Sequence, residues 1–151
     1  MATLVNIKEK LQADKTAFWK AGKTLEKDTL AVVLGNIQYE EKKGKTIKVF
    51  SDDEIQTFIF TEMKNRRDVS ATYAAAGVTD RAEREAAESE FLLNYLPEQL
   101  PEEAIRGIVN KAVVELGEDA NLGKIMKKVM PFTKNRADGE FVREIVQEHI
   151  S

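Results

Sequence analysis

The sequence predicts an all-α fold, in which an N-terminal helical domain precedes a small C-terminal three-helix domain. Glycine and proline, which interrupt helices, account for only eight and three of the 151 residues and mostly separate periodic segments. Between them the chain is rich in Ala, Leu, Glu and Lys, and its apolar residues recur at helical spacing. A hydrophobic content of 42% is sufficient for a buried core. We therefore expect about seven helices and no sheet.

Four helices are expected in the first part of the chain. The third has the clearest start, because S-D-D-E at 51–54 is the pattern of a capping box, in which serine and glutamate each bond the backbone of the other. Gly77 should end this helix, and Thr79 should cap the next one. The stretch TIKVF, 46–50, has no evident partner strand and is interpreted as an extended linker. The expected helices cover about 3–21, 25–42, 51–77 and 80–96.

The stretch Y-L-P-E-Q-L-P, 95–101, is the best candidate for a domain boundary. Its two prolines cannot both lie inside one straight helix, because each lacks a backbone N–H and disfavours helical backbone before it. We therefore expect an N-terminal helical domain over 1–96 and a C-terminal domain over 97–151.

Three helices are expected in the C-terminal domain. Pro101 suits the first turn of the first helix, and Gly117 should end it. A short second helix should stop at Pro131. The third should begin at Asp138, whose carboxylate can accept from an amide of the first turn while Gly139 allows a tight entry. Asp138 and Gly139 are thus predicted to be a structural motif.

Composition excludes several classes of function. The chain has no cysteine, which excludes disulfides, thiol catalysis and Cys-based zinc sites, and its single histidine leaves little for a His-ligated metal. We therefore expect no metal and no cofactor. No apolar run approaches the roughly 20 residues that span a bilayer, and the N-terminus lacks the apolar region of a signal peptide. A cytoplasmic location without membrane association is expected.

Charge is distributed unevenly along the chain, although the formal net charge is only −3. The region 80–103 has two arginines against eight acidic residues, a net −6. The region 122–136 has five basic residues and no acid, a net +5. Such a local excess of cations can attract a polyanion even when the whole chain is slightly acidic.

Four stretches form a combination that is more specific than any one of them alone. They are MKNRRD (63–68), YAAAGVTDRAEREAAESEFLLNYLPEQLPEEAI (73–105), LGKIMKKVMP (122–131) and NRADGEFV (135–142). In this order they resemble the GatB/YqeY family over essentially the whole chain. The resemblance implies the same two-domain helical organisation that the two prolines predict.

Members of that family look like the C-terminal tail of the B subunit of the tRNA-dependent amidotransferase. That tail helps to hold the tRNA while a separate part of the complex performs the chemistry. The resemblance therefore implies tRNA or another folded RNA as partner and no catalytic residue in this chain. Amidotransferase activity, a carbon-nitrogen ligase activity with glutamine as amido-N-donor, would be a family label that no residue here supports.

Two positions depart from the family's pattern. Asn135 stands before the R-A-D-G arginine, where glycine is usual, and Ala31-Val32-Val33 stands where the second helix usually has an arginine. Asparagine also enters the left-handed region of backbone conformation, so the first change is tolerable. The second weakens the case for nucleic-acid contact by that helix.

The basic region 122–136 holds the candidate RNA-binding residues. Three of its lysines follow i, i+3, i+4 spacing and so share one helix face. The alternative interpretation is a solvated basic face. Phe132 is the only aromatic residue among these basic residues, so we expect contacts to the phosphate backbone rather than base-specific recognition. The candidates are Lys124, Lys127, Lys128, Lys134 and Arg136.

A second candidate basic patch lies on the third helix. It comprises Lys64, Arg66 and Arg67. The alternative is an exposed charged stripe paired with Glu62 or Asp68, which lie close enough along the helix to form ion pairs.

A protein-interaction adaptor is the alternative function. The acidic region 80–103, interpreted as a helix with a solvated face, could instead dock a basic partner or the basic C-terminal domain. Trp19, beside Phe18, is expected in the core or between domains, the alternative being an exposed partner surface. His149 is expected to be a helix-end residue favoured by the helix dipole rather than a catalytic base.

Overall fold

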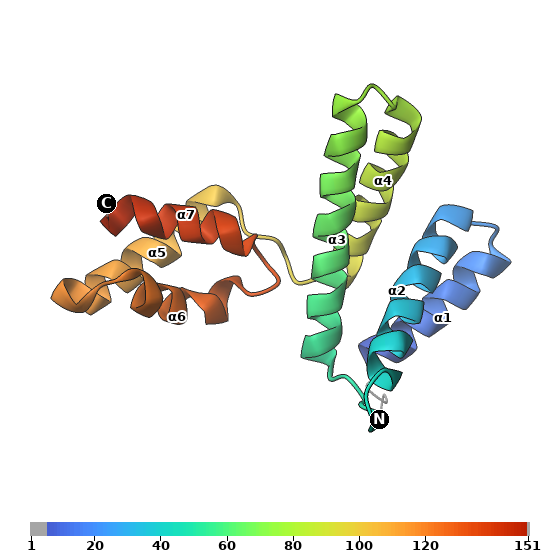
Figure 1. Cartoon of the computed structure of the whole chain (residues 1–151), viewed down its shortest axis with the longest axis horizontal. Helices are drawn as coiled ribbons and strands as arrows, with labels where there is room; N and C mark the ends of the chain where they lie inside the picture. The colour runs from blue at the N-terminus through green and yellow to red at the C-terminus, as the bar shows by residue number, and fades with distance from the viewer. Residues whose placement is uncertain (1–5, 151) are drawn as a thin grey trace. The chain divides into compact units, whose positions relative to one another are not determined.

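A computed structural model describes residues 6–150, and over these residues the protein is all-α, with seven α-helices, two short 3₁₀ helices and no strand (Figure 1). The chain divides into two compact units, of which the first ends at Leu96 and the second begins at Pro97. Within the described part of the chain, no helix combines the length and the apolar character that crossing a bilayer requires.

The first unit consists of two helical hairpins (Figure 1). Short turns join α1 to α2 and α3 to α4, and both turns contain a glycine with positive φ, Gly22 and Gly77. Such a φ favours glycine because it has no Cβ to clash. The elements are α1 (Ile7–Lys20), α2 (Thr24–Lys42), α3 (Asp52–Ala75), α4 (Thr79–Leu92) and the 3₁₀ turn η1 (Leu93–Tyr95).

The core of the first unit collects aliphatic side chains from all four helices, and aromatic rings close one side of it. Phe91 stacks edge-to-face with both Phe18 and Tyr95, at ring centroid distances of 5.5 and 5.7 Å. Trp19 takes no part, because 65% of its surface is exposed. The expectation that it packs in the core is therefore wrong. The largest fully buried side chains are Leu11, Leu30, Ile37, Ile55, Ile59 and Leu92.

The starts of the helices confirm some of the caps that the sequence predicts and contradict others. The capping box is confirmed: the Ser51 hydroxyl accepts from the Glu54 amide, and the Glu54 carboxylate accepts from the Ser51 amide. Thr79 is not a cap but the first residue of α4, and Val78 occupies the cap position without a side-chain bond. The first helix begins at Ile7 because Asn6 caps it; the rest of the expected start lies outside the described residues.

Glu41 ties the connection between the two hairpins to α1. Its carboxylate accepts from Lys8 Nζ at 2.6 Å and from the Phe50 amide at 3.1 Å, while its carbonyl accepts from the Lys48 amide at 2.9 Å. These bonds keep the pKa of the buried Glu41 carboxyl below its ordinary value, chiefly through the Lys8 hydrogen bond. The connection forms no strand: residues 43–46 are bends and 47–50 have no regular secondary structure, so the expected absence of a strand at 46–50 is confirmed.

The second unit contains the three expected helices, with a core of Ile105, Val109, Ile125, Val129, Val142 and Ile145. Pro101 occupies the N-cap position of the first helix, without a side-chain bond, instead of lying in its first turn, and Gly117 ends the helix with a φ of +56°. The second helix does not stop at Pro131 but continues for two residues beyond it. The elements are α5 (Glu102–Leu116), the 3₁₀ turn η2 (Gly117–Asp119), α6 (Leu122–Thr133) and α7 (Gly139–Ile150).

The continuation of α6 has a physical reason. Proline removes the bond that its own amide would donate to the Lys127 carbonyl and its ring crowds that carbonyl, but residue 127 lies on the exposed side, where water can replace the donor. The Thr133 hydroxyl bonds the Val129 carbonyl at 3.2 Å, and the Lys134 amide bonds the Met130 carbonyl at 3.0 Å. These two bonds close the end of the helix.

Candidate nucleic-acid interface

Helix α6 separates an apolar side from a basic side. Asn121 caps it by accepting from the Lys124 amide at 2.9 Å, and Ile125 and Val129 are fully buried. Four exposed lysines occupy its other side and its C-terminal end. Since ten residues of helix span roughly 15 Å, they form an extended row rather than a point charge. This lysine stripe comprises Lys124, Lys127, Lys128 and Lys134.

Only one member of the lysine stripe has an ion-pair partner within the described residues. Lys128 Nζ lies 2.6 Å from Glu115 Oε2 on α5, and this contact lowers the pKa of the Glu115 carboxyl. For Lys124, Lys127 and Lys134 there is no carboxylate within ion-pair distance in that part of the chain. The stripe therefore keeps most of its positive charge available to an external anion.

Arg136, the fifth candidate, is held by the protein's own backbone. Its Nε donates to the Glu98 carbonyl at 3.1 Å and its Nη1 donates to the Phe132 carbonyl at 3.3 Å. The second bond satisfies a carbonyl at the C-terminal end of α6, where a cation is favoured by the helix dipole. Arg136 thus connects the end of α6 to the segment before α5, and it differs in this from the four lysines.

The turn between α6 and α7 has the conformation that its sequence predicts. Asn135 has a φ of 61°, in the left-handed region that asparagine tolerates. The Asn135 carbonyl accepts from Gln99 Nε2 at 2.9 Å, and the Arg136 carbonyl accepts from the Leu100 amide at 2.8 Å. Asp138 Oδ1 accepts from the amide of Glu140 at 3.0 Å, in the first turn of α7. The prediction that Asp138 starts this helix is confirmed.

The second basic patch is not the single exposed surface that its sequence suggests. Arg66 is 13% exposed and lies among carboxylates of α3 and α4: it bonds Glu62 at 3.0 Å, Glu85 at 3.5 Å and Glu88. Glu88 is itself buried and also accepts from Arg84. Because these carboxylates neutralise Arg66, it cannot contribute to an external basic surface. We call these residues, Glu62, Arg66, Glu85 and Glu88, the Arg66 cluster.

The other two members of that patch, Lys64 and Arg67, are half-buried and exposed respectively, and each has an interaction within the protein. The acidic region 80–103 is not one helix either. It runs through α4 and η1 of the first unit into the start of α5 in the second. His149 lies in the last turn of α7, where its ring nitrogens contact the Ile145 carbonyl and the Asn110 side chain.

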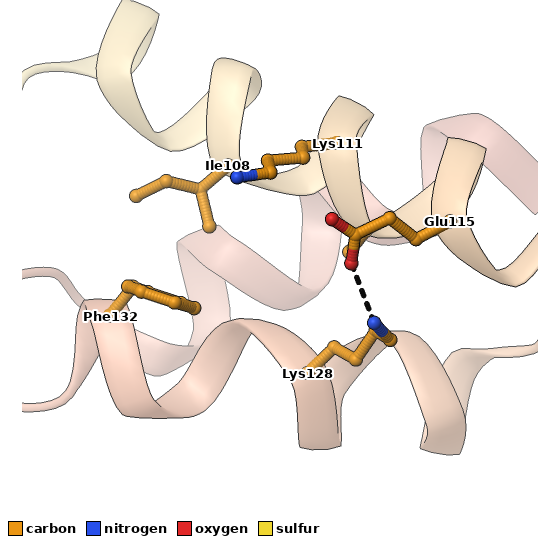
Figure 2. A pocket seen from close by; sticks show the side chains of 6 residues that line it. Ile108, Lys111, Glu115, Lys128 and Phe132 are labelled. Carbon is orange, nitrogen blue, oxygen red and sulfur yellow. Dashed lines mark hydrogen bonds and ion pairs between the residues drawn. The ribbon is translucent and has the colours of Figure 1, made fainter.

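A groove of about 450 Å³ lies between α5 and α6, beside the lysine stripe. Figure 2 shows Ile108 and Phe132 facing each other from the two helices, while Glu115 and Lys128 bridge the groove further along. The Phe132 ring is 58% exposed. We call this the aromatic groove; its lining is Ile108, Lys111, Ala112, Glu115, Lys128 and Phe132.

Comparison with known proteins identifies the family. A family model described as Yqey-like protein matches residues 8–150. The chain belongs to the YqeY-like family. The match extends from α1 to the end of α7, so both helical units belong to the YqeY-like pattern. No curated protein gives a match.

Sequence patterns located the lysine stripe of this YqeY-like protein but not the aromatic groove. Lys111 and Glu115 are four residues apart on α5 and both exposed, a spacing that predicts a shared helix face. Their position opposite Lys128 and Phe132 depends on how α5 and α6 pack together. Within the described residues, no group of histidine and acidic side chains is arranged to hold a metal ion.

Proposed function

We propose that this YqeY-like protein is a non-catalytic module that binds tRNA or another folded RNA through its phosphate backbone. The observation that carries the proposal is the lysine stripe: four exposed lysines in one row, three of them without a carboxylate partner in residues 6–150. Lysine contacts to phosphate position a protein on a nucleic acid without reading its sequence. We expect the protein to act in the cytoplasm.

The energetic basis of such binding is counterion release. Each neutralised phosphate frees condensed cations. The logarithm of the binding constant therefore falls linearly with the logarithm of the salt concentration, with a slope of roughly 0.7 to 0.9 per contact. The three lysines without a carboxylate partner in residues 6–150 therefore predict a slope of roughly two to three. Arg136 is assigned a positioning role, because two backbone carbonyls already accept from its guanidinium.

Folded RNA is proposed as the ligand on the basis of the family. The family resembles the tail that holds tRNA in the tRNA-dependent amidotransferase, and the lysine stripe lies in the second unit of this chain. A chain with no catalytic constellation in its sequence and a row of lysines is suited to holding a polyanion, not to transforming it.

Gel-shift titration with tRNA at low salt tests the proposal. We expect Lys124→Glu/Lys127→Glu to weaken binding at least tenfold, because two phosphate contacts become repulsions. The matched control is Lys20→Glu/Lys45→Glu, which makes the same change of charge at exposed lysines of the first unit. Absence of tRNA binding by the wild-type protein, or equal loss in both double variants, would contradict the proposal.

The second candidate function, a protein-interaction adaptor, is favoured by one observation. Trp19 exposes 65% of its surface at the end of α1, and an exposed tryptophan is common in contact sites between proteins. A pull-down from cytoplasm with and without ribonuclease separates the two functions. Partners that ribonuclease releases favour RNA binding, whereas partners that persist and are lost in Trp19→Ala favour the adaptor.

A further inference from the structure

The aromatic groove has two parts of different chemistry. Ile108, Ala112 and the ring of Phe132 make an apolar part, and the Glu115–Lys128 bridge limits it on one side (Figure 2). Lys111 adds a second cation on the α5 side. A flat apolar surface beside cations is suited to a ligand that is itself flat and carries negative charge at its edge.

Phe132 is available for such a ligand. Its ring is 58% exposed, and it stacks on no other aromatic ring of the described residues. The core beneath α6 is formed by Ile125 and Val129, so the fold does not depend on Phe132. An exposed aromatic side chain that packing does not require commonly marks a binding surface.

The position of Phe132 relative to the lysine stripe indicates the class of ligand. Phe132 is on the same helix as Lys124 and Lys128, at positions that place it one turn beyond Lys128. Single-stranded nucleic acids are bound in this way, with bases stacked on aromatic rings and phosphates held by basic side chains. The groove joins both features at one site.

Glu115 favours a base over an acidic peptide. The pKa of its carboxyl is lowered, so it is ionised at neutral pH and can only accept hydrogen bonds. A carboxylate accepts from the amino group of a base such as cytosine. An acidic side chain placed in the groove would be repelled by this carboxylate, whereas a base in the same position carries no charge.

We propose that the aromatic groove holds an unpaired base of the bound RNA, stacked on Phe132, while the flanking phosphates contact Lys124 and Lys127. This inference rests on the proposed function and extends it: the ligand is a folded RNA that presents an unpaired nucleotide. Lys111 stands on the opposite rim and is available to a further phosphate.

Two RNAs with the same stem test the inference, one closed by an unpaired loop and the other a blunt-ended duplex. We expect the wild-type protein to bind the looped RNA about tenfold more tightly, the magnitude of one stacked base. Phe132→Ala and Phe132→Leu should remove the preference without changing duplex binding, and Phe132→Trp should keep it. A 2-aminopurine placed in the loop should lose fluorescence on binding to the wild type and to Phe132→Trp only.

The outcomes separate this inference from the proposed function. Equal binding of both RNAs by the wild type, or full retention of the preference by Phe132→Leu, overturns the aromatic groove as a base site while RNA binding stands. Absence of binding to either RNA overturns both. Lys124→Glu/Lys127→Glu should weaken both RNAs alike. Capture of a labelled acidic peptide in place of RNA, lost in Phe132→Ala, would assign the groove to a protein partner instead. Circular dichroism checks that each variant keeps its helix content.

Discussion

The Arg66 cluster and the lysine stripe use the same kind of charge for opposite purposes. Arg66 is a largely enclosed cation, 13% exposed, that contacts carboxylates from two helices, so its charge holds α3 and α4 together. The lysines of the stripe lie on one exposed side of α6, and Lys128 alone has an acidic partner in residues 6–150. The difference lies in the carboxylates within reach, not in the number of cations.

Basic clusters that look alike in the sequence have different surroundings in the fold. Both MKNRRD (63–68) and LGKIMKKVMP (122–131) contain three cations in a helical segment. The first faces an acidic helix, α4, and the second faces an apolar core and solvent. Stability is therefore expected to respond to the first cluster and ligand binding to the second.

The largest expected effect is on stability in the Arg66 cluster. Arg66→Ala leaves the buried Glu88 without its main partner, and removing one member of a buried ion pair costs about 3 kcal/mol. Urea unfolding followed by circular dichroism measures the loss. Lys127→Ala removes the same charge from an exposed position and should change the free energy of unfolding by less than about 0.5 kcal/mol. Similar losses in the two variants would show that Arg66 contributes no more to stability than an exposed lysine.

A smaller loss of stability is expected at Arg136. Arg136→Ala removes two hydrogen bonds to backbone carbonyls and should lower the free energy of unfolding by about 1.5 kcal/mol. The Arg136→Lys variant keeps the charge but cannot reach both carbonyls with one planar group, so it should restore little of the loss. If Arg136→Lys is as stable as the wild type, the guanidinium bonds do not hold the turn.

Substitutions at the starts of α3 and α4 are expected to differ by about 1 kcal/mol in the free energy of unfolding. Ser51→Ala removes a capping box and should destabilise the protein by about that amount. Thr79→Ala should be nearly neutral, because Thr79 lies inside α4 and caps nothing. Thermal unfolding of the two variants provides the measurement. A larger loss for Thr79→Ala than for Ser51→Ala would contradict the assignment of these two helix starts.

The smallest effect concerns Glu41 and depends on pH. Folding lowers the pKa of this carboxyl, so the folded protein binds the proton less tightly than the unfolded chain. Glu41 therefore stabilises the fold at neutral pH, and this contribution is lost as the pH falls below about 4.3. Glu41→Gln should cost less than about 1 kcal/mol at pH 7, and the stability difference from the wild type should narrow in acid. If the stability difference between the wild type and Glu41→Gln stays constant from neutral pH into acid, the titration of Glu41 does not contribute to stability.

The sequence predicted those features of the fold that depend on contacts between residues close together along the chain. The capping box at Ser51 and the helix start at Asp138 involve residues two or three positions apart, and both form as expected. The partners of Arg66 on α4 are about twenty residues away along the chain and depend on how two helices pack. The same holds for Arg136, whose bond to the Glu98 carbonyl spans 38 residues.

Sequence patterns also did not predict that α6 continues past Pro131. A proline predicts an interruption, but its cost is low where water can reach the carbonyl that loses its donor. The two additional residues include Phe132, whose ring then lies on the helix, at the aromatic groove. The spacing of the lysines could be predicted from the sequence. The groove beside them could not, because it depends on how α5 packs on α6.

The salt dependence of tRNA binding measures how many lysines of the stripe contact phosphates. The three lysines of the stripe without a carboxylate partner in residues 6–150 predict that the logarithm of the binding constant falls with the logarithm of salt concentration with a slope of roughly two to three. Lys127→Ala should reduce that slope by roughly 0.7 to 0.9, and Lys45→Ala should leave it unchanged. A slope near zero, or equal reductions in the two variants, would show that the lysine stripe does not hold the RNA.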